Sequence, residues 1–154
     1  MKIFLGVILL IISTFVGYIK SSKFTFRRIF FDDFNTFNNK LKNEVAFKQG
    51  TIINLLQNEN DNGDFMFGIK NVFINKESLS LKSNYLSDKE IKLYNDYISK
   101  IGTLDKVSQI EYLNSIEAEI SSIKKQCIAD EEKYKNLYIK LGFFVGLILL
   151  ILVL

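Results

Sequence analysis

The stretch from Ile3 to Ile19 reads IFLGVILLIISTFVGYI and has no charged residue in 17 positions. A helix needs about 20 apolar residues to cross a bilayer, so this segment lies at the short end of the usual range. Lys2 and Lys20 bracket it, and Tyr18 sits where interfacial aromatic residues are found. We therefore expect an N-terminal transmembrane helix over residues 1–20.

A second apolar stretch, LGFFVGLILLILVL, covers Leu141 to Leu154. Alone it would form a helix of roughly 21 Å. Residues 137–139 extend it to 18 positions if the Lys140 side chain reaches toward water. This stretch predicts a C-terminal transmembrane helix over residues 141–154, and the two apolar ends leave residues 21–140 as a separate domain.

The N-terminal segment has an alternative interpretation as a cleaved signal peptide. Only one lysine precedes the apolar run, and no A-x-A-like cleavage site follows it. These features favour a retained membrane anchor.

Basic residues indicate the orientation of the two spans, because cytoplasmic flanks carry an excess of Lys and Arg. Only Lys2 and the amino terminus lie on the other side. We expect residues 21–140 to face the cytoplasm and both termini to lie across the membrane. The residues that predict this arrangement are Lys20, Lys23, Arg27 and Arg28 after the first span, and Lys124, Lys125, Lys133, Lys135 and Lys140 before the second.

Small residues recur at a spacing of four in both spans, as Ser13 and Gly17 and as Gly142 and Gly146. Such faces allow helix backbones to approach closely in lipid. In an antiparallel pair, Gly17 would lie level with Gly142 and Ser13 with Gly146. The alternative is chance, because glycine is common in membrane helices.

The interval between the spans predicts an all-α bundle. An amphipathic helix is expected from Phe24 to Gln49, with Gly50 as its C-cap. Its apolar stripe is interpreted as core, with a partner-binding groove as the alternative. The stripe consists of Phe26, Phe30, Phe34, Phe37, Leu41 and Val45.

Three shorter features follow in the chain. Thr51 is expected to cap a short helix, and Asp64 to cap another. Ser87 and Glu90 form the pattern of a capping box at the start of a further helix. Residues 75–86 are predicted as a short helix or an irregular turn, because no second strand is available to pair with them.

The last helix has the most regular pattern, with Asp105 as its predicted cap. Apolar residues recur at alternating spacings of three and four, which is typical of a bundle or coiled-coil seam. The seam runs into the second span and predicts one helix over residues 105–154. It would face either the protein's own bundle or another copy. Its members are Leu113, Ile116, Ile120, Ile123, Cys127, Asp130, Tyr134, Leu137 and Leu141.

The composition argues against an enzyme and against cofactor or metal binding. The chain has no histidine and a single cysteine, Cys127, so Ser-His or Cys-His catalysis and the usual zinc sites are excluded. No phosphate-binding glycine motif is present. The net charge of +3 is too small to favour a nucleic-acid partner.

Three segments together resemble the stage III sporulation protein AB family of endospore-forming bacteria. They are KLKNEVAFKQGTIINLL (Lys40 to Leu56), KIGTLDKVSQIEYL (Lys100 to Leu113) and EKYKNLYIKLGFFVGLILLILVL (Glu132 to Leu154). A proline that follows the threonine in the family pattern is missing here. The positions that match the family's motifs are Glu44, Thr51, Gly102, Asp105, Gln109, Leu141, Gly142 and Gly146.

The resemblance implies a membrane scaffold in the mother-cell membrane facing the forespore. It implies membership of an assembly similar to type II secretion and type IV pilus machines. Expected partners are a cytoplasmic ATPase, other membrane subunits of the channel and the lipid bilayer. A holin-like or other membrane-permeabilising protein is the alternative, since two short spans with few polar residues would also suit it.

Overall fold

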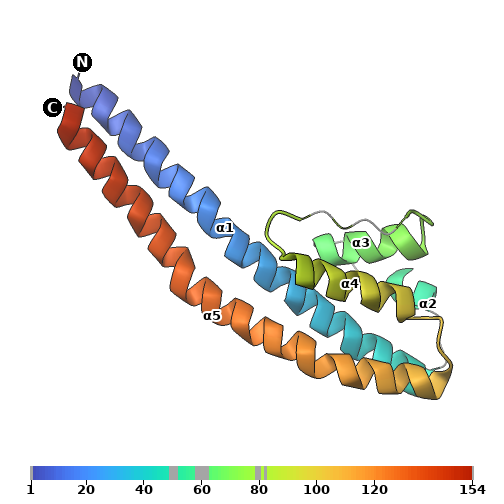
Figure 1. Ribbon diagram of the computed structural model, residues 1–154. Coiled ribbons are helices and arrows are strands. Elements are labelled where there is room, and N and C mark those ends of the chain that lie inside the picture. Colours follow the sequence, from blue (N-terminus) through green and yellow to red (C-terminus); the bar gives the residue numbers. More distant parts are fainter. Residues whose placement is uncertain (1, 49–51, 58–62, 79–80, 82, 154) are drawn as a thin grey trace. The chain divides into compact units, whose positions relative to one another are not determined.

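The computed structural model describes residues 2–48, 52–57, 63–78, 81 and 83–153. Within these residues every regular element is a helix and none is a strand, which confirms the all-α prediction (Figure 1). The elements are α1 (Lys2–Asn43), the π-helix η1 (Glu44–Lys48), α2 (Ile52–Gln57), α3 (Asp64–Phe73), α4 (Asp88–Lys100) and α5 (Lys106–Val153).

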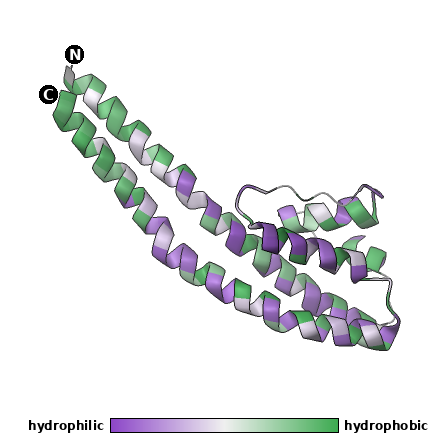
Figure 2. Ribbon diagram, in the orientation of Figure 1, coloured by the Kyte–Doolittle hydropathy of each residue, from purple (hydrophilic) through white to green (hydrophobic). Residues whose placement is uncertain are grey.

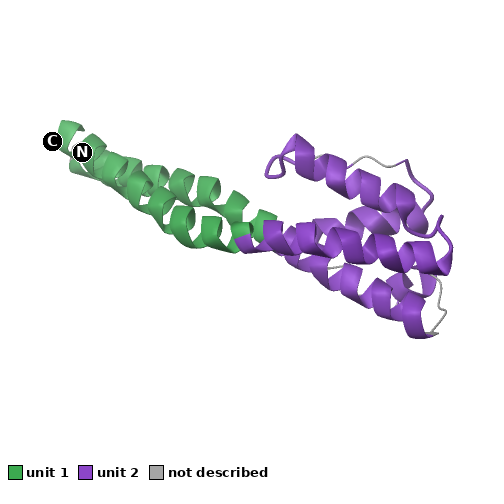
Figure 3. Ribbon diagram, turned by 60° about the horizontal axis from the view of Figure 1, so that its bottom comes forward, with its two compact units in different colours: residues 1–28, 126–154 green, residues 29–125 purple. Residues whose placement is uncertain are grey.

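The chain divides into two compact units, coloured separately in Figure 3. Unit 1 combines residues 1–28 with 126–154, and unit 2 comprises residues 29–125. Helices α1 and α5 each contribute to both units. These boundaries follow which parts of the backbone lie close together, whereas the segments expected from the sequence follow hydropathy.

Unit 1 is an antiparallel pair of helices, with the two termini of the chain at the same end (Figure 1). Figure 2 shows that the terminal part of each helix is almost entirely apolar. Both helices are long and apolar enough to cross a membrane. Only 11% of the most apolar window of α1 and 6% of that of α5 are buried, unlike the core helix of a soluble protein.

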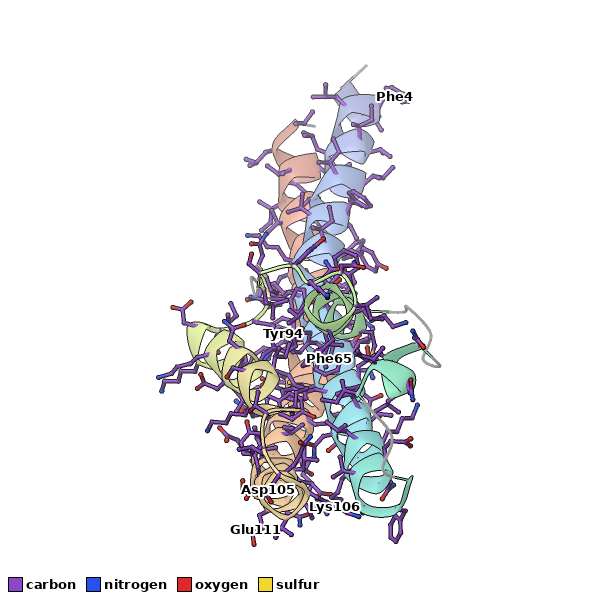
Figure 4. The ribbon with its side chains drawn as sticks, turned by 90° about the vertical axis from the view of Figure 1, so that its right-hand side faces the viewer. Phe4, Phe65, Tyr94, Asp105, Lys106 and Glu111 are labelled. Atoms are coloured by element: carbon purple, nitrogen blue, oxygen red, sulfur yellow. The ribbon has the colours of Figure 1, made fainter. Side chains whose placement is uncertain are left out.

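Unit 2 has its own aromatic core. Phe34 of α1 stacks on Phe65 of α3 at a centroid distance of 5.0 Å and meets Tyr97 of α4 edge-on at 4.7 Å. Figure 4 shows Phe65 and Tyr94 together, and their rings are 5.6 Å apart. The other buried apolar side chains include Phe30, Phe31, Phe37, Leu41, Leu56, Ile69, Leu113, Ile116 and Ile120.

These contacts confirm the core interpretation for most of the phenylalanine stripe. Two members of the stripe lie outside the core: Phe26, with 53% of its surface exposed, and Val45, which is only partly buried. Sequence periodicity missed Phe31, which is fully buried beside Phe30. A helix surrounded on more than one side buries a wider arc than a single stripe.

The capping box at the start of α4 is confirmed. The Ser87 hydroxyl accepts a hydrogen bond from the Glu90 amide, and the Glu90 carboxylate accepts one from the Ser87 amide. The prediction that Asp64 caps α3 was wrong. Gly63 holds that position with φ of 112°, a conformation that favours glycine, so Asp64 is the first helical residue.

The connection between α3 and α4 contains turns and bends where it is described, which agrees with the irregular-turn alternative. Predictions for Gly50, Thr51 and the residues 58–62 fall outside the described part of the chain.

Candidate functional site

The two helices of unit 1 approach closely where Gly17 of α1 meets Gly142 of α5. A Cβ atom at Gly17 would lie 2.6 Å from the Tyr138 carbonyl oxygen, and one at Gly142 would lie 2.8 Å from the Ser13 carbonyl oxygen. Backbone atoms cannot move aside as side chains do. The Ser13 hydroxyl also donates a 2.7 Å hydrogen bond to the Gly142 carbonyl oxygen. The structure therefore brings together three of the four small residues singled out in the sequence.

The fourth residue, Gly146, does not lie opposite Ser13 as expected. Its nearest neighbour across the pair is Leu10, whose Cα would lie 2.9 Å from a Cβ at Gly146. The Ser13 hydroxyl is bonded to the Gly142 carbonyl oxygen, so Ser13 lies closer to Gly142 than it would in the predicted pairing with Gly146. Leu10 therefore packs against Gly146.

Polar side chains link the two helices beyond the apolar segments. Arg27 forms a 2.8 Å ion pair with Asp130, and Arg28 forms one with Glu131. The Thr25 hydroxyl donates a 2.7 Å hydrogen bond to Glu131. These residues, together with Lys135, which is 3.2 Å from the same carboxylate, are called the ionic cluster below.

The ionic cluster explains a feature that sequence reasoning left open. Asp130 interrupts an otherwise apolar seam, and the structure supplies Arg27 as its partner. Burial alone would raise the pKa of the Glu131 carboxyl. Hydrogen bonds from Thr25, Lys135 and Arg28 outweigh that effect and hold the pKa below its ordinary value.

An aromatic group lies next to the ionic cluster. The Phe24 ring stacks on Tyr134 at 5.4 Å and lies 5.7 Å from Tyr138. The Lys23 ammonium lies 4.9 Å from the centre of the Phe24 ring and 5.6 Å from that of Tyr138. Lys133 lies 5.0 Å over Tyr134. We call these five residues the interfacial cluster.

The predicted flanking basic residues thus separate into two groups. Arg27 and Arg28 are engaged with carboxylates. Lys20, Lys23 and Lys140 are exposed. Sequence reasoning gave all five the same role, because the positive-inside rule counts charges without regard to their partners.

Three family-motif residues meet at the turn between α4 and α5 in unit 2. Gly102 has φ of 78°, and its amide donates a 3.3 Å hydrogen bond to the buried Gln109 side chain. The Asp105 carboxylate caps α5 by accepting bonds from the amides of Val107 and Ser108, and hydrogen bonds from Ser108 lower the pKa of Asp105. This confirms Asp105 as a cap. The contacts of these three residues shape the turn and the start of α5.

Two other family-motif residues, Glu44 and Thr51, lie outside the turn between α4 and α5. Glu44 is the first residue of η1, and Thr51 lies outside the described residues. Cys127 is buried, as expected for a member of the seam. Across the described residues, no three Cys, Asp or Glu side chains are grouped so that they could hold a metal ion.

Comparison with known families gives a clear result. A family model described as Stage III sporulation protein AB matches residues 69–154, which is more than half of the chain. The chain belongs to this family. The match confirms the resemblance and includes Gly102, Asp105 and Gln109, but it does not extend to Glu44 or Thr51.

Neither a curated protein nor a solved structure matches the chain. Family membership indicates a role in stage III of sporulation. The two apolar helices of this family member are consistent with association with a membrane.

Proposed function

We propose that this chain is a non-catalytic scaffold subunit of the stage III sporulation channel, anchored in the mother-cell membrane by unit 1. Unit 2 then forms the cytoplasmic part, which binds the ATPase of the same assembly. The observation that carries the proposal is the contact of Gly17 with Gly142, which makes one antiparallel hairpin of the two apolar helices.

The charge distribution supports this orientation. Lys20, Lys23 and Lys140 are exposed next to the apolar segments on the side from which α1 and α5 continue into unit 2. Basic residues in this position favour retention in the cytoplasm. Unit 2 would then be available to a soluble partner.

The organisation of unit 2 supports binding in preference to permeabilisation. It has a close-packed aromatic core, a capping box at Ser87 and a capped α5. A protein that only forms pores has no need of such a unit. Purified protein in dye-loaded liposomes should therefore cause no more leakage than an unrelated two-span protein, and rapid leakage would favour the holin-like alternative.

The genetic test is deletion of the gene followed by complementation. Deletion should stop sporulation after engulfment and leave vegetative growth unchanged. Normal sporulation in the deletion strain would overturn the proposal.

The biochemical test uses the full-length, detergent-solubilised protein as bait. The stage III ATPase should bind wild-type protein, and binding should be lost when the unit 2 core is disrupted by Phe34→Asp. The matched control is Phe15→Ala, which changes an exposed phenylalanine in unit 1. Equal recovery of the ATPase with F34D would show that unit 2 is not its binding site.

A further inference from the structure

The interfacial cluster combines two features that rarely occur together on a soluble surface. Phe24 stacks on Tyr134 across the helix pair and makes a tilted contact with Tyr138. Lys23 places its ammonium group over the Phe24 and Tyr138 rings, and Lys133 over the Tyr134 ring. Neither lysine has a carboxylate partner in the part of the chain that the structure describes.

The position of the cluster along the helices corresponds to the lipid headgroups. Lys23 and Phe24 lie four and five residues beyond Ile19, or about 6–8 Å of helix. Tyr134 lies three residues before Leu137, or about 5 Å. A headgroup layer is roughly 5–7 Å thick on each side of the hydrocarbon core. The cluster therefore lies within that layer or at its outer edge when the two apolar segments span the bilayer.

The ionic cluster determines which charges remain available. On α5, Asp130 and Glu131 are engaged by Arg27, Arg28 and Lys135, and Glu132 is exposed. Neutralisation of the arginines leaves the lysines as the available positive charge at headgroup depth. Lys20 and Lys140 are exposed in the adjoining turns and add to the same positive field.

We propose that the interfacial cluster binds the headgroups of anionic phospholipids, with Lys23 and Lys133 supplying the positive charge. The aromatic rings hold the two lysine side chains against the helix pair, which reduces the rotamer freedom lost when a headgroup binds. A lipid is favoured over a soluble anion because the apolar surfaces of both helices continue from the cluster into the hydrocarbon region. The proposal requires membrane insertion of unit 1 but does not depend on the sporulation role.

The test is native mass spectrometry of the full-length protein in detergent, titrated with phosphatidylglycerol or phosphatidylcholine. Wild-type protein should retain phosphatidylglycerol preferentially. The double variant K23Q/K133Q should bind it roughly 30-fold more weakly, because each basic side chain near an anionic lipid surface contributes about a fivefold gain. Unchanged far-UV circular dichroism would establish that the variant is folded.

Two further variants act as controls. K23R/K133R keeps both charges and should retain the lipid. K92Q/K125Q removes two exposed lysines of unit 2 and should bind like wild type. Equal phosphatidylglycerol binding by K23Q/K133Q and wild type would overturn the proposal, as would displacement of the lipid by an equal concentration of inorganic phosphate.

Discussion

Individual carboxylates differ in how well the fold accommodates their charge. The Oδ2 atom of Asp33 is buried without a hydrogen-bond partner among the described residues, and it faces Gly63. Burial, followed by repulsion from Asp32, raises the pKa of Asp33 above its ordinary 3.8. Because the folded pKa is raised, ionised Asp33 destabilises unit 2 above that pKa, and protonation relieves the cost as pH falls.

Asp33→Asn should therefore stabilise unit 2 at pH 7 by about 1 kcal/mol, a value reduced for partial solvent exposure. The gain should shrink as pH falls toward 4, where the wild-type carboxyl becomes protonated. Hydrogen exchange of the α3 and α4 amides at pH 7 and at pH 4 measures the gain in stability of unit 2. Asp32 lies 2.5 Å from Lys124, so Asp32→Asn is a control that should not stabilise. An equal gain for D33N at both pH values would contradict the explanation.

Glu131 shows the opposite behaviour. Its pKa is lowered, so its stabilising contribution is present above the ordinary value of 4.5 and is lost as pH falls through the lower folded value. Glu131→Gln should weaken the contact between α1 and α5 by about 1 kcal/mol at pH 7, since it removes charged hydrogen bonds from a partly shielded group.

The neighbouring Glu132 is exposed, which makes Glu132→Gln a matched control. Hydrogen exchange of the amides at residues 24–28 should increase in E131Q and remain unchanged in E132Q. The difference should shrink as pH falls through the lowered pKa of Glu131. Equal exchange in the two variants at pH 7 would show that the ionic cluster contributes nothing.

At the scale of elements, the helix pair depends on glycine backbones at one contact. Gly142→Ala should separate α1 from α5, because its Cβ would meet backbone atoms of Ser13 and Gly17. Gly6→Ala is the matched control, since its Cβ would meet mainly the terminal Cδ1 of Leu150, which can rotate away. Both variants add the same single methyl group.

The separation can be measured by cross-linking cysteines at positions 14 and 139, whose side chains line the same apolar groove on unit 1. The buried Cys127 is replaced by serine in all of these proteins. A short bis-maleimide should join the two positions efficiently in the parent and in G6A, and several-fold less in G142A. Undiminished cross-linking in G142A would contradict close backbone packing.

The helices themselves were largely predictable from sequence. Spacings of three and four residues predicted the core face of α1, and the regular seam, interrupted only by Asp130, predicted α5 within a residue at each end. Ser87 with Glu90 and Asp105 marked helix starts because capping depends on residues close in sequence. The N-cap of α3 was assigned to Asp64 in place of Gly63, because glycine has no side-chain oxygen by which a cap is recognised in a sequence.

Contacts between helices were harder to predict. The partners of Arg27 and Arg28 depend on the register of α1 against α5, and a shift of one turn would place residues about four positions away on α5 opposite them. That register is fixed by Gly17, Gly142 and the Ser13 hydrogen bond, so small residues in the apolar segments decide which charges meet. The interfacial cluster was missed for the same reason.

At the scale of the whole molecule, the central claim is that unit 1 spans the membrane as a hairpin and unit 2 lies in the cytoplasm. Exposed Lys92 of α4 reports on unit 2, and a cysteine appended after Leu154 reports on the opposite end of the hairpin. Both are placed separately in protein that lacks Cys127.

The most direct measurement is labelling of these single cysteines with a membrane-impermeant maleimide in intact bacterial spheroplasts and after lysis. We predict that the appended cysteine is labelled in intact spheroplasts and that the cysteine at position 92 is labelled only after lysis. Labelling at position 92 in intact spheroplasts would contradict the account, because unit 2 would then face away from the cytoplasm.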